Sequence, residues 1–172
     1  MKRLLMSILL AAAMLSPAQA QQDLAKLSNA QIEAKATEVH PAALYVLASR
    51  LLAEGKGQEA ANWMYAGQLR YRFLIEAAGS AAGNENVLFS ALTEQVGRPV
   101  NEYIAGNVDE WLAAMDWALE WDAANANGVT SKTEHAEALA KVRDGLAQFR
   151  AEVEADRENI PRKREANGLV NR

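Results

Sequence analysis

Residues 44–67, LYVLASRLLAEGKGQEAANWMYAG, contain the pattern that decides the fold. In the first half, apolar side chains recur three and four positions apart, the spacing of one helix face, at Leu44, Leu47, Ala48 and Leu51. Gly55 follows, and glycine commonly ends a helix. The same spacing resumes at Ala60, Met64 and Gly67. The stretch therefore predicts two helices joined by a short turn.

The second of these helices carries apolar residues on two sides. Tyr65, Leu69 and Phe73 recur at four-residue intervals on the side away from Ala60 and Met64. A helix with two apolar faces is normally packed between neighbours. We therefore expect the helix over 58–78 to lie in the interior of the protein.

The rest of the chain continues the helical pattern. Ser28 and Gln31 have capping-box spacing, Asn107 can cap the helix that follows it, and no segment shows the period-two alternation of a strand. Proline removes a backbone donor, so we expect a break at Gly97-Arg98-Pro99. The pattern predicts an all-α fold, a short solenoid-like or bundle arrangement of about five to six helices with helical-hairpin repeats.

The hairpin at 44–67 resembles a tetratricopeptide-type repeat. The leucines and Ala48 match its first helix, Gly55 matches its turn, and Glu59-Ala60 with Met64 and Gly67 match its second helix. A degenerate second match covers 106–119, where Trp111 stands at a position that the family fills with a small residue. The turn glycines, Gly55 and Gly106, are 51 residues apart, whereas the family repeat is about 34 residues long. A regular tandem array is therefore excluded.

The resemblance implies a protein that works through its surface. Such hairpins usually present their first helix to a groove that receives a peptide or a partner protein. The groove-facing positions of the better match are then Tyr45, Ser49 and Leu52. The alternative is that these side chains pack on a neighbouring helix.

The first twenty residues have the pattern of a secretory signal. Lys2 and Arg3 precede an apolar run, and Ser16-Pro17-Ala18-Gln19-Ala20 supplies the small residues of a cleavage site. The run of about 12 apolar residues is shorter than the roughly 20 that span a bilayer. We expect a signal peptide over 1–20, cleavage after Ala20, a periplasmic location and no membrane insertion afterwards. A single α-helical domain over 21–160 and a flexible polar tail over 161–172 would follow.

The composition narrows the class of partner. The chain has no Cys, so packing alone must hold an exported fold. Loss of Lys2 and Arg3 reduces the 18 basic residues to 16 against 22 acidic ones, a net charge of −6. Nucleic acid and anionic lipid reward clustered Lys and Arg, so neither suits this chain. We expect a protein or peptide partner in the cell envelope.

A pair of tryptophans provides a second candidate binding surface. Trp117 and Trp121 lie one helical turn apart, on a flank that Glu110 shares. Two aromatic rings beside a carboxylate can stack on a sugar, a cationic group or a partner's side chain. The alternative is that the last helix covers both rings.

Arg70 and Arg72 interrupt an otherwise apolar helix. In an acidic chain, we expect them to pair with carboxylates of the tryptophan-rich helix rather than to bind an anion. His40 and His135 are the only histidines, and neither has a second ligand at helical spacing, so no metal site is predicted.

The sequence contains no catalytic motif and implies no cofactor. Without Cys and without a Gly-x-Ser-x-Gly elbow, it names no nucleophile. Two alternatives to a binding module stay open. One is an immunity or inhibitor protein against a secreted, envelope-targeting toxin, and the other is a small cell-wall hydrolase that uses acids such as Glu110 and Asp116.

Overall fold

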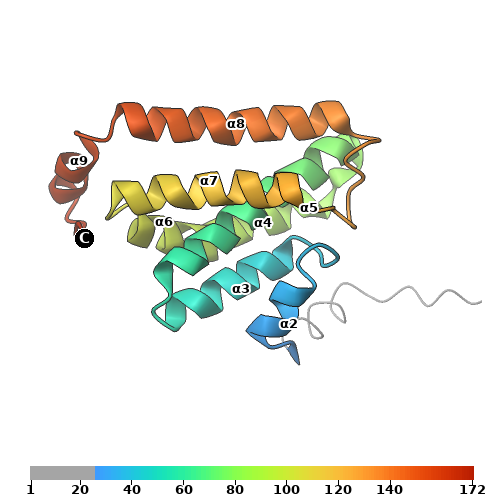
Figure 1. Cartoon of the computed structure of the whole chain (residues 1–172), viewed down its shortest axis with the longest axis horizontal. Coiled ribbons are helices and arrows are strands. Elements are labelled where there is room, and N and C mark those ends of the chain that lie inside the picture. The colour runs from blue at the N-terminus through green and yellow to red at the C-terminus, as the bar shows by residue number, and fades with distance from the viewer. Residues whose placement is uncertain (1–25) are drawn as a thin grey trace, which may run out of the picture.

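The computed structural model describes residues 26–172, so the signal segment expected at 1–20 lies outside the described residues. Within 26–172 the regular elements are helices without a strand, and the all-α fold class is confirmed (Figure 1). None of these helices is long and apolar enough to cross a membrane. The α-helices are α2 (Asn29–Ala34), α3 (Ala42–Ala53), α4 (Gly57–Ala78), α5 (Asn84–Leu92), α6 (Arg98–Ile104), α7 (Val108–Ala124), α8 (Ala136–Ala155) and α9 (Ile160–Ala166).

The central helix is α4. It packs against α3 and α7 and also contacts α6 and α8, and Figure 1 shows it between α3 and α7, with α8 along the outer side of α7. Both apolar lines predicted for this helix are buried. The line toward α3 comprises Ala60, Met64, Gly67 and Tyr71, and the second line comprises Tyr65, Leu69 and Phe73.

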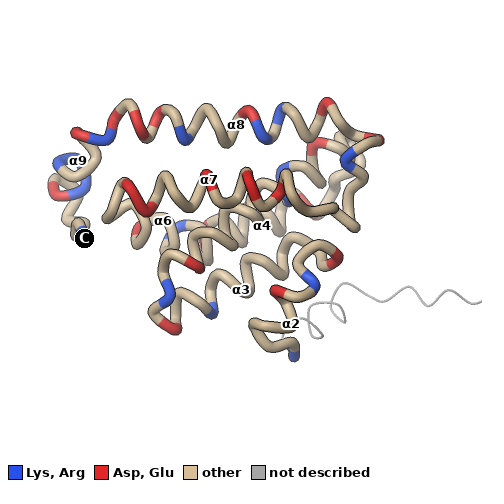
Figure 2. Tube along the Cα trace, viewed as in Figure 1, with Lys and Arg blue, Asp and Glu red and all other residues tan. Residues whose placement is uncertain are grey.

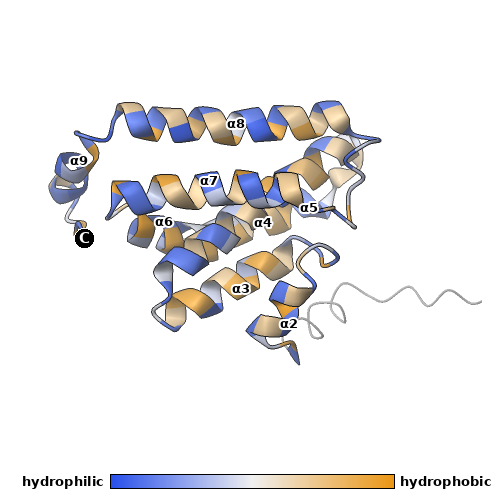
Figure 3. Cartoon of the chain, in the orientation of Figure 1, coloured by the Kyte–Doolittle hydropathy of each residue, from blue (hydrophilic) through white to orange (hydrophobic). Residues whose placement is uncertain are grey.

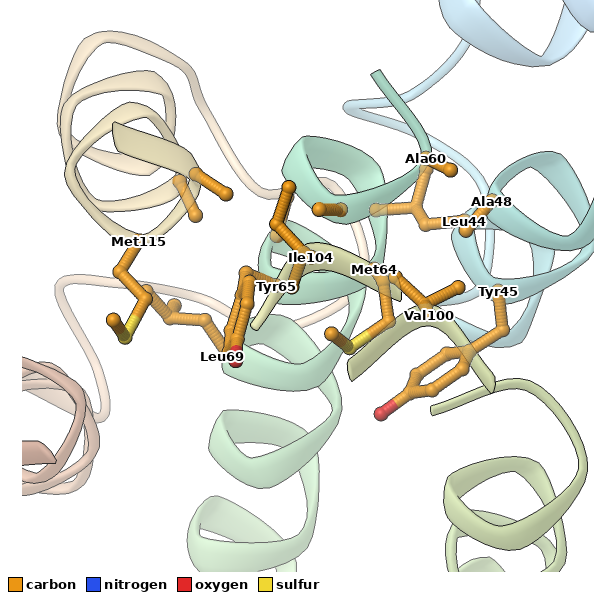
Figure 4. Close-up of a cluster of buried hydrophobic side chains, with 14 of the residues drawn as sticks. Leu44, Tyr45, Ala48, Ala60, Met64, Tyr65, Leu69, Val100, Ile104 and Met115 are labelled. Carbon is orange, nitrogen blue, oxygen red and sulfur yellow. The ribbon is translucent and has the colours of Figure 1, made fainter. Parts of the chain in front are cut away.

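The predicted hairpin consists of α3 and α4. The turn passes through Gly55 at φ +78°, a conformation that glycine adopts without a steric penalty. Leu44 and Tyr45 of α3 meet Ala60 and Met64 of α4 in the core, where α6 and α7 also contribute side chains (Figure 4). In keeping with this, α3 is coloured mainly as apolar, whereas α8 alternates between polar and apolar residues (Figure 3).

The chain does not break at Gly97-Arg98-Pro99, contrary to the sequence-based expectation. Instead, α5 passes through a π-helical turn, Thr93–Gly97, directly into α6. Within this turn the Arg98 backbone N–H donates to the Thr93 carbonyl, five residues earlier. A widened turn makes room for the Pro99 ring, which clashes with a carbonyl of the preceding turn in a regular helix. Residues 84–104 thus form one helical arm, which we call the α5–α6 arm.

The stretch 161–172, expected to form a flexible polar tail, contains most of α9. Pro161 lies in the first turn of α9, where its fixed φ suits a helix start, and both Ile160 and Arg164 are buried. Arg172 donates to the carbonyl and hydroxyl oxygens of Tyr103 and pairs with Glu110 at 2.5 Å. These contacts attach the tail to α6 and α7.

A buried charge cluster joins α4, α7 and α8. Asp122 of α7 is fully buried and forms ion pairs with Arg70 at 3.4 Å, Lys132 at 3.3 Å and Arg143 at 3.0 Å. The carboxylate that pairs with Arg70 thus comes from the tryptophan-rich helix, as predicted. Elsewhere, charged residues of both signs lie along helices such as α8 (Figure 2).

Candidate binding groove

One strip of α4 is covered by neither α3 nor α7. It carries Gln68, Arg72 and Glu76, four positions apart and therefore on one side of the helix. On either side of this strip, α8 and the α5–α6 arm pack on α4. Between them lies a cavity of about 590 Å³, which we call the α4 groove. Its volume falls within the range of about 300–1,000 Å³ that is usual for ligand sites.

Four helices line the α4 groove. The floor comes from α4, with Tyr65, Gln68, Leu69, Arg72, Ile75 and Glu76. The α5–α6 arm forms one wall, with Asn86, Phe89 and Asn101. The other wall comes from α8, with Lys141, Val142, Gly145, Leu146 and Phe149.

The apolar stripe of α8 is only partly covered where it borders the groove. Leu146, Phe149 and Val153 lie three and four positions apart and form this stripe. Leu146 and Val153 are buried, but Phe149 is 39% exposed. Gly145 lies one helical turn before Phe149, and a Cβ built there would meet no atom within 4 Å. The part of the groove beside Gly145 is therefore open space that no side chain among residues 26–172 fills.

A hydrogen-bond chain fixes the polar end of the groove. The Tyr65 hydroxyl accepts from the Trp111 indole N–H at 2.5 Å and donates to the Asn101 side-chain oxygen at 2.8 Å. Burial raises the pKa of Tyr65 above its ordinary value, so this hydroxyl stays protonated at neutral pH. Because the side-chain oxygen of Asn101 accepts from Tyr65, the amide N–H groups of Asn101 are available as donors.

The charged groups of the groove are two cations and one acid. Lys141 of α8 pairs with Glu76 of α4 at 2.6 Å, and both side chains are more than one third exposed. The Arg72 guanidinium lies 5.5 Å from the centre of the Phe89 ring. Among residues 26–172 no carboxylate pairs with Arg72, so the expectation of a salt bridge holds for Arg70 and not for Arg72.

The expected aromatic shelf is a cluster of three tryptophans. Trp117 and Trp121 stack with ring centres 6.0 Å apart and planes 10° apart, and Trp63 of α4 packs edge-on at 5.1 and 5.3 Å. The Arg70 guanidinium lies 4.2 Å from the centre of the Trp121 ring. Contacts from α4 therefore cover these rings in part. All three stay half-buried, and their role in partner binding stays a prediction.

Glu110 and Asp116, the two acids suggested for hydrolysis, both form ion pairs. Glu110 pairs with Arg172 rather than with the tryptophans, and Asp116 binds the Arg150 guanidinium through both carboxylate oxygens, at 3.0 and 3.1 Å. Six positions along a helix place the two side chains about 120° apart around α7. The structure does not bring these acids together.

The groove expected along the first helix of the hairpin is closed at Tyr45. This residue is fully buried and packs edge-on against Tyr71 and Phe89, each with ring centres 6.4 Å apart. Tyr45 thus packs on neighbouring helices, the alternative to a groove position, because α4 and the α5–α6 arm cover that side of α3. Leu52 is half-buried and Ser49 is exposed.

The two histidines lie apart from the groove floor. His40 faces Glu85, with Nε2 at 3.4 Å from the carboxylate, and packs edge-on against Tyr71. His135 lies at the start of α8. Across residues 26–172, no three His, Cys, Asp or Glu side chains gather in a way that would hold a metal ion.

Comparison with protein-family models, with curated protein sequences and with solved structures gives no match for this chain. The site therefore has to be assigned from its own geometry. Sequence reasoning missed the α4 groove, although two signals were present. One is the polar line of Gln68, Arg72 and Glu76 on a helix that is otherwise largely apolar, and the other is Gly145 in the interior of a long helix, where glycine costs about 1 kcal/mol relative to alanine.

Proposed function

We propose that the chain is an exported helical module that binds a segment of a partner protein in the cell envelope, and that the α4 groove is the binding site. The observation that carries this proposal is the open space between α8 and the α5–α6 arm. Apolar side chains such as Phe149 and Ile75 border it, together with a few polar groups. This combination is typical of ligand sites in proteins.

Export is part of the same proposal. It is supported by the basic start, short apolar run and small residues of positions 1–20. Cell fractionation followed by N-terminal sequencing tests it. We expect the protein in the periplasmic fraction with Gln21 as its first residue, and a full-length chain retained inside the cell would contradict export.

Gly145 allows a sharp test of the groove. A leucine at this position enters the open space without a clash, because a Cβ there meets no atom within 4 Å. Gly145→Ala is the matched control, since it brings the same change from glycine in the helix but leaves the groove open. Affinity capture from envelope extract with residues 21–172 should give the same partner for the wild type and Gly145→Ala, and little or none for Gly145→Leu.

The same experiment separates the rival surfaces and activities. If the Trp117→Ala, Trp121→Ala double variant loses the partner while Gly145→Leu keeps it, the tryptophan cluster is the binding surface and the groove assignment is wrong. Release of fragments from peptidoglycan by the purified chain would favour a hydrolase instead. Capture of a secreted toxin would favour the immunity or inhibitor function.

A further inference from the structure

The α4 groove has an unusual charge balance for this chain. The whole protein carries 22 acidic and 18 basic residues, but the groove is lined by Arg72 and Lys141 against Glu76 alone. Several arginines elsewhere are paired with carboxylates, as Arg150 is with Asp116 and Arg143 with Asp122. The groove is thus locally cationic on an acidic protein.

The position of Arg72 suits it to receive a carboxylate. The guanidinium lies beside the Phe89 ring, at 5.5 Å from the ring centre, and a planar guanidinium on an aromatic ring is restricted in its orientation. Its N–H groups match the two oxygens of a carboxylate in a bidentate pair. Because no acid among residues 26–172 pairs with Arg72, binding an incoming carboxylate breaks no ion pair of this residue.

A second cation can join at low cost. The pair between Lys141 and Glu76 is exposed, at 70% and 37% of the respective side chains, and exposed pairs contribute about 0–1 kcal/mol. Lys141 can therefore turn toward a ligand. The Asn101 amide N–H groups add further donors, because the oxygen of this side chain already accepts from Tyr65.

On these grounds we propose that the α4 groove selects an acidic peptide segment, one in which an Asp, a Glu or a terminal carboxylate lies next to apolar side chains. The carboxylate binds Arg72 and then Lys141, and the apolar side chains occupy the space beside Phe149 and Gly145. This inference rests on the proposed function, and it adds the chemistry of the partner.

Selection from a displayed library of short random peptides tests the inference on the full exported chain. We expect enrichment of sequences with Asp or Glu beside apolar residues. An enriched peptide is then synthesised with its acid intact and with that acid replaced by Asn or Gln. Binding of both versions is measured by fluorescence anisotropy to the wild type and to Arg72→Gln, and Arg162→Gln, an exposed arginine on α9, is the control.

Loss of a hydrogen-bonded charge pair should weaken binding about tenfold to a hundredfold. We expect that loss when either Arg72 or the peptide acid is neutralised, little further loss when both are changed, and none with Arg162→Gln. Peptides that lose binding with Gly145→Leu but show no acidic preference, or no effect of Arg72→Gln, would overturn the inference and leave the proposed groove intact. Failure to select any peptide, or selection of peptides unaffected by Gly145→Leu, would overturn both.

Discussion

Neutralising Asp122 should destabilise the protein far more than neutralising Asp116, although both acids lie on α7 and both bind arginine. Asp122 is fully buried, and Arg70, one of its three cationic partners, is 2% exposed. Asp122→Asn keeps the volume of the side chain but leaves the buried guanidinium without its counter-charge. Removal of one partner from a buried ion pair typically costs about 3–5 kcal/mol.

The other two partners of Asp122 limit the cost. Lys132 and Arg143 are 22% and 29% exposed, so they can turn toward water, and Arg70 keeps its hydrogen bonds to the carbonyls of Ala36 and Ala126. We therefore expect a loss of about 3 kcal/mol, the lower end of that range. Asp116→Asn breaks a pair with side chains 32% and 44% exposed, for which about 0–1 kcal/mol is typical.

Urea unfolding of residues 21–172, followed by tryptophan fluorescence and far-ultraviolet circular dichroism, measures both losses. Domains of this size usually have about 5–15 kcal/mol of unfolding free energy, so Asp122→Asn should still fold. The Arg70→Met, Asp122→Leu double variant should recover most of the loss, because an apolar pair needs no counter-charge. Equal midpoints for Asp122→Asn and Asp116→Asn would refute the claim that burial decides the cost.

Two further predictions concern local contacts. A Cβ on Gly57 would overlap the Tyr103 ring, so Gly57→Ala should lower the free energy of unfolding by about 1–3 kcal/mol, as measured in urea. The Arg172 guanidinium packs on the same ring, so the variant should also speed hydrogen exchange over 168–172. Gly145→Ala, with open space around its Cβ, should instead stabilise by up to about 1 kcal/mol, and similar behaviour of the two variants would contradict the packing. Burial lowers the pKa of His40 below its ordinary value of 6.5, although the nearby Glu85 carboxylate acts in the opposite direction. As the pH falls, the unfolded chain therefore binds a proton on this residue before the folded chain does. The free energy of unfolding should then decrease below about pH 6.5. Between pH 7.5 and pH 5, the urea midpoint should fall less for His40→Asn than for the wild type. Equal decreases of the midpoint in the two proteins would exclude a contribution from His40.

Local patterns in the sequence were sufficient to predict the hairpin and the helix caps. The Ser28 side chain accepts from the Gln31 backbone as the capping box requires, and Asn107 caps α7 by accepting from the Glu110 backbone. The apolar spacing on both sides of Gly55 gave α3 and α4 because each face is defined by residues three and four positions apart. These features depend on near neighbours in the chain.

Features that depend on distant residues were predicted less well. Helical spacing puts Val87 on one face with Leu88 and Ala91, which predicts an inward position, yet Val87 is 70% exposed. The presence of Pro99 predicted a helix break, but a π-helical turn accommodates this residue. The sequence alone does not reveal that turn. Tyr45 was assigned to a groove because nothing in the spacing shows that the α5–α6 arm covers it. In each case a residue's face was set locally, but the element that covers the face comes from elsewhere in the chain.

The α4 groove arises because the α3–α4 hairpin and the α7–α8 pair do not follow each other directly in the chain. Between the two turn glycines, the chain inserts the α5–α6 arm on one side of α4, and α7 and α8 then pack on another. A helix that is contacted from several sides should be apolar on all of them. The line of Gln68, Arg72 and Glu76 departs from that rule on the strip that lies in the groove. Apolar side chains at these positions would favour closure of α8 onto the arm, whereas the exposed side chains of Arg72 and Glu76 leave this strip of α4 open to solvent.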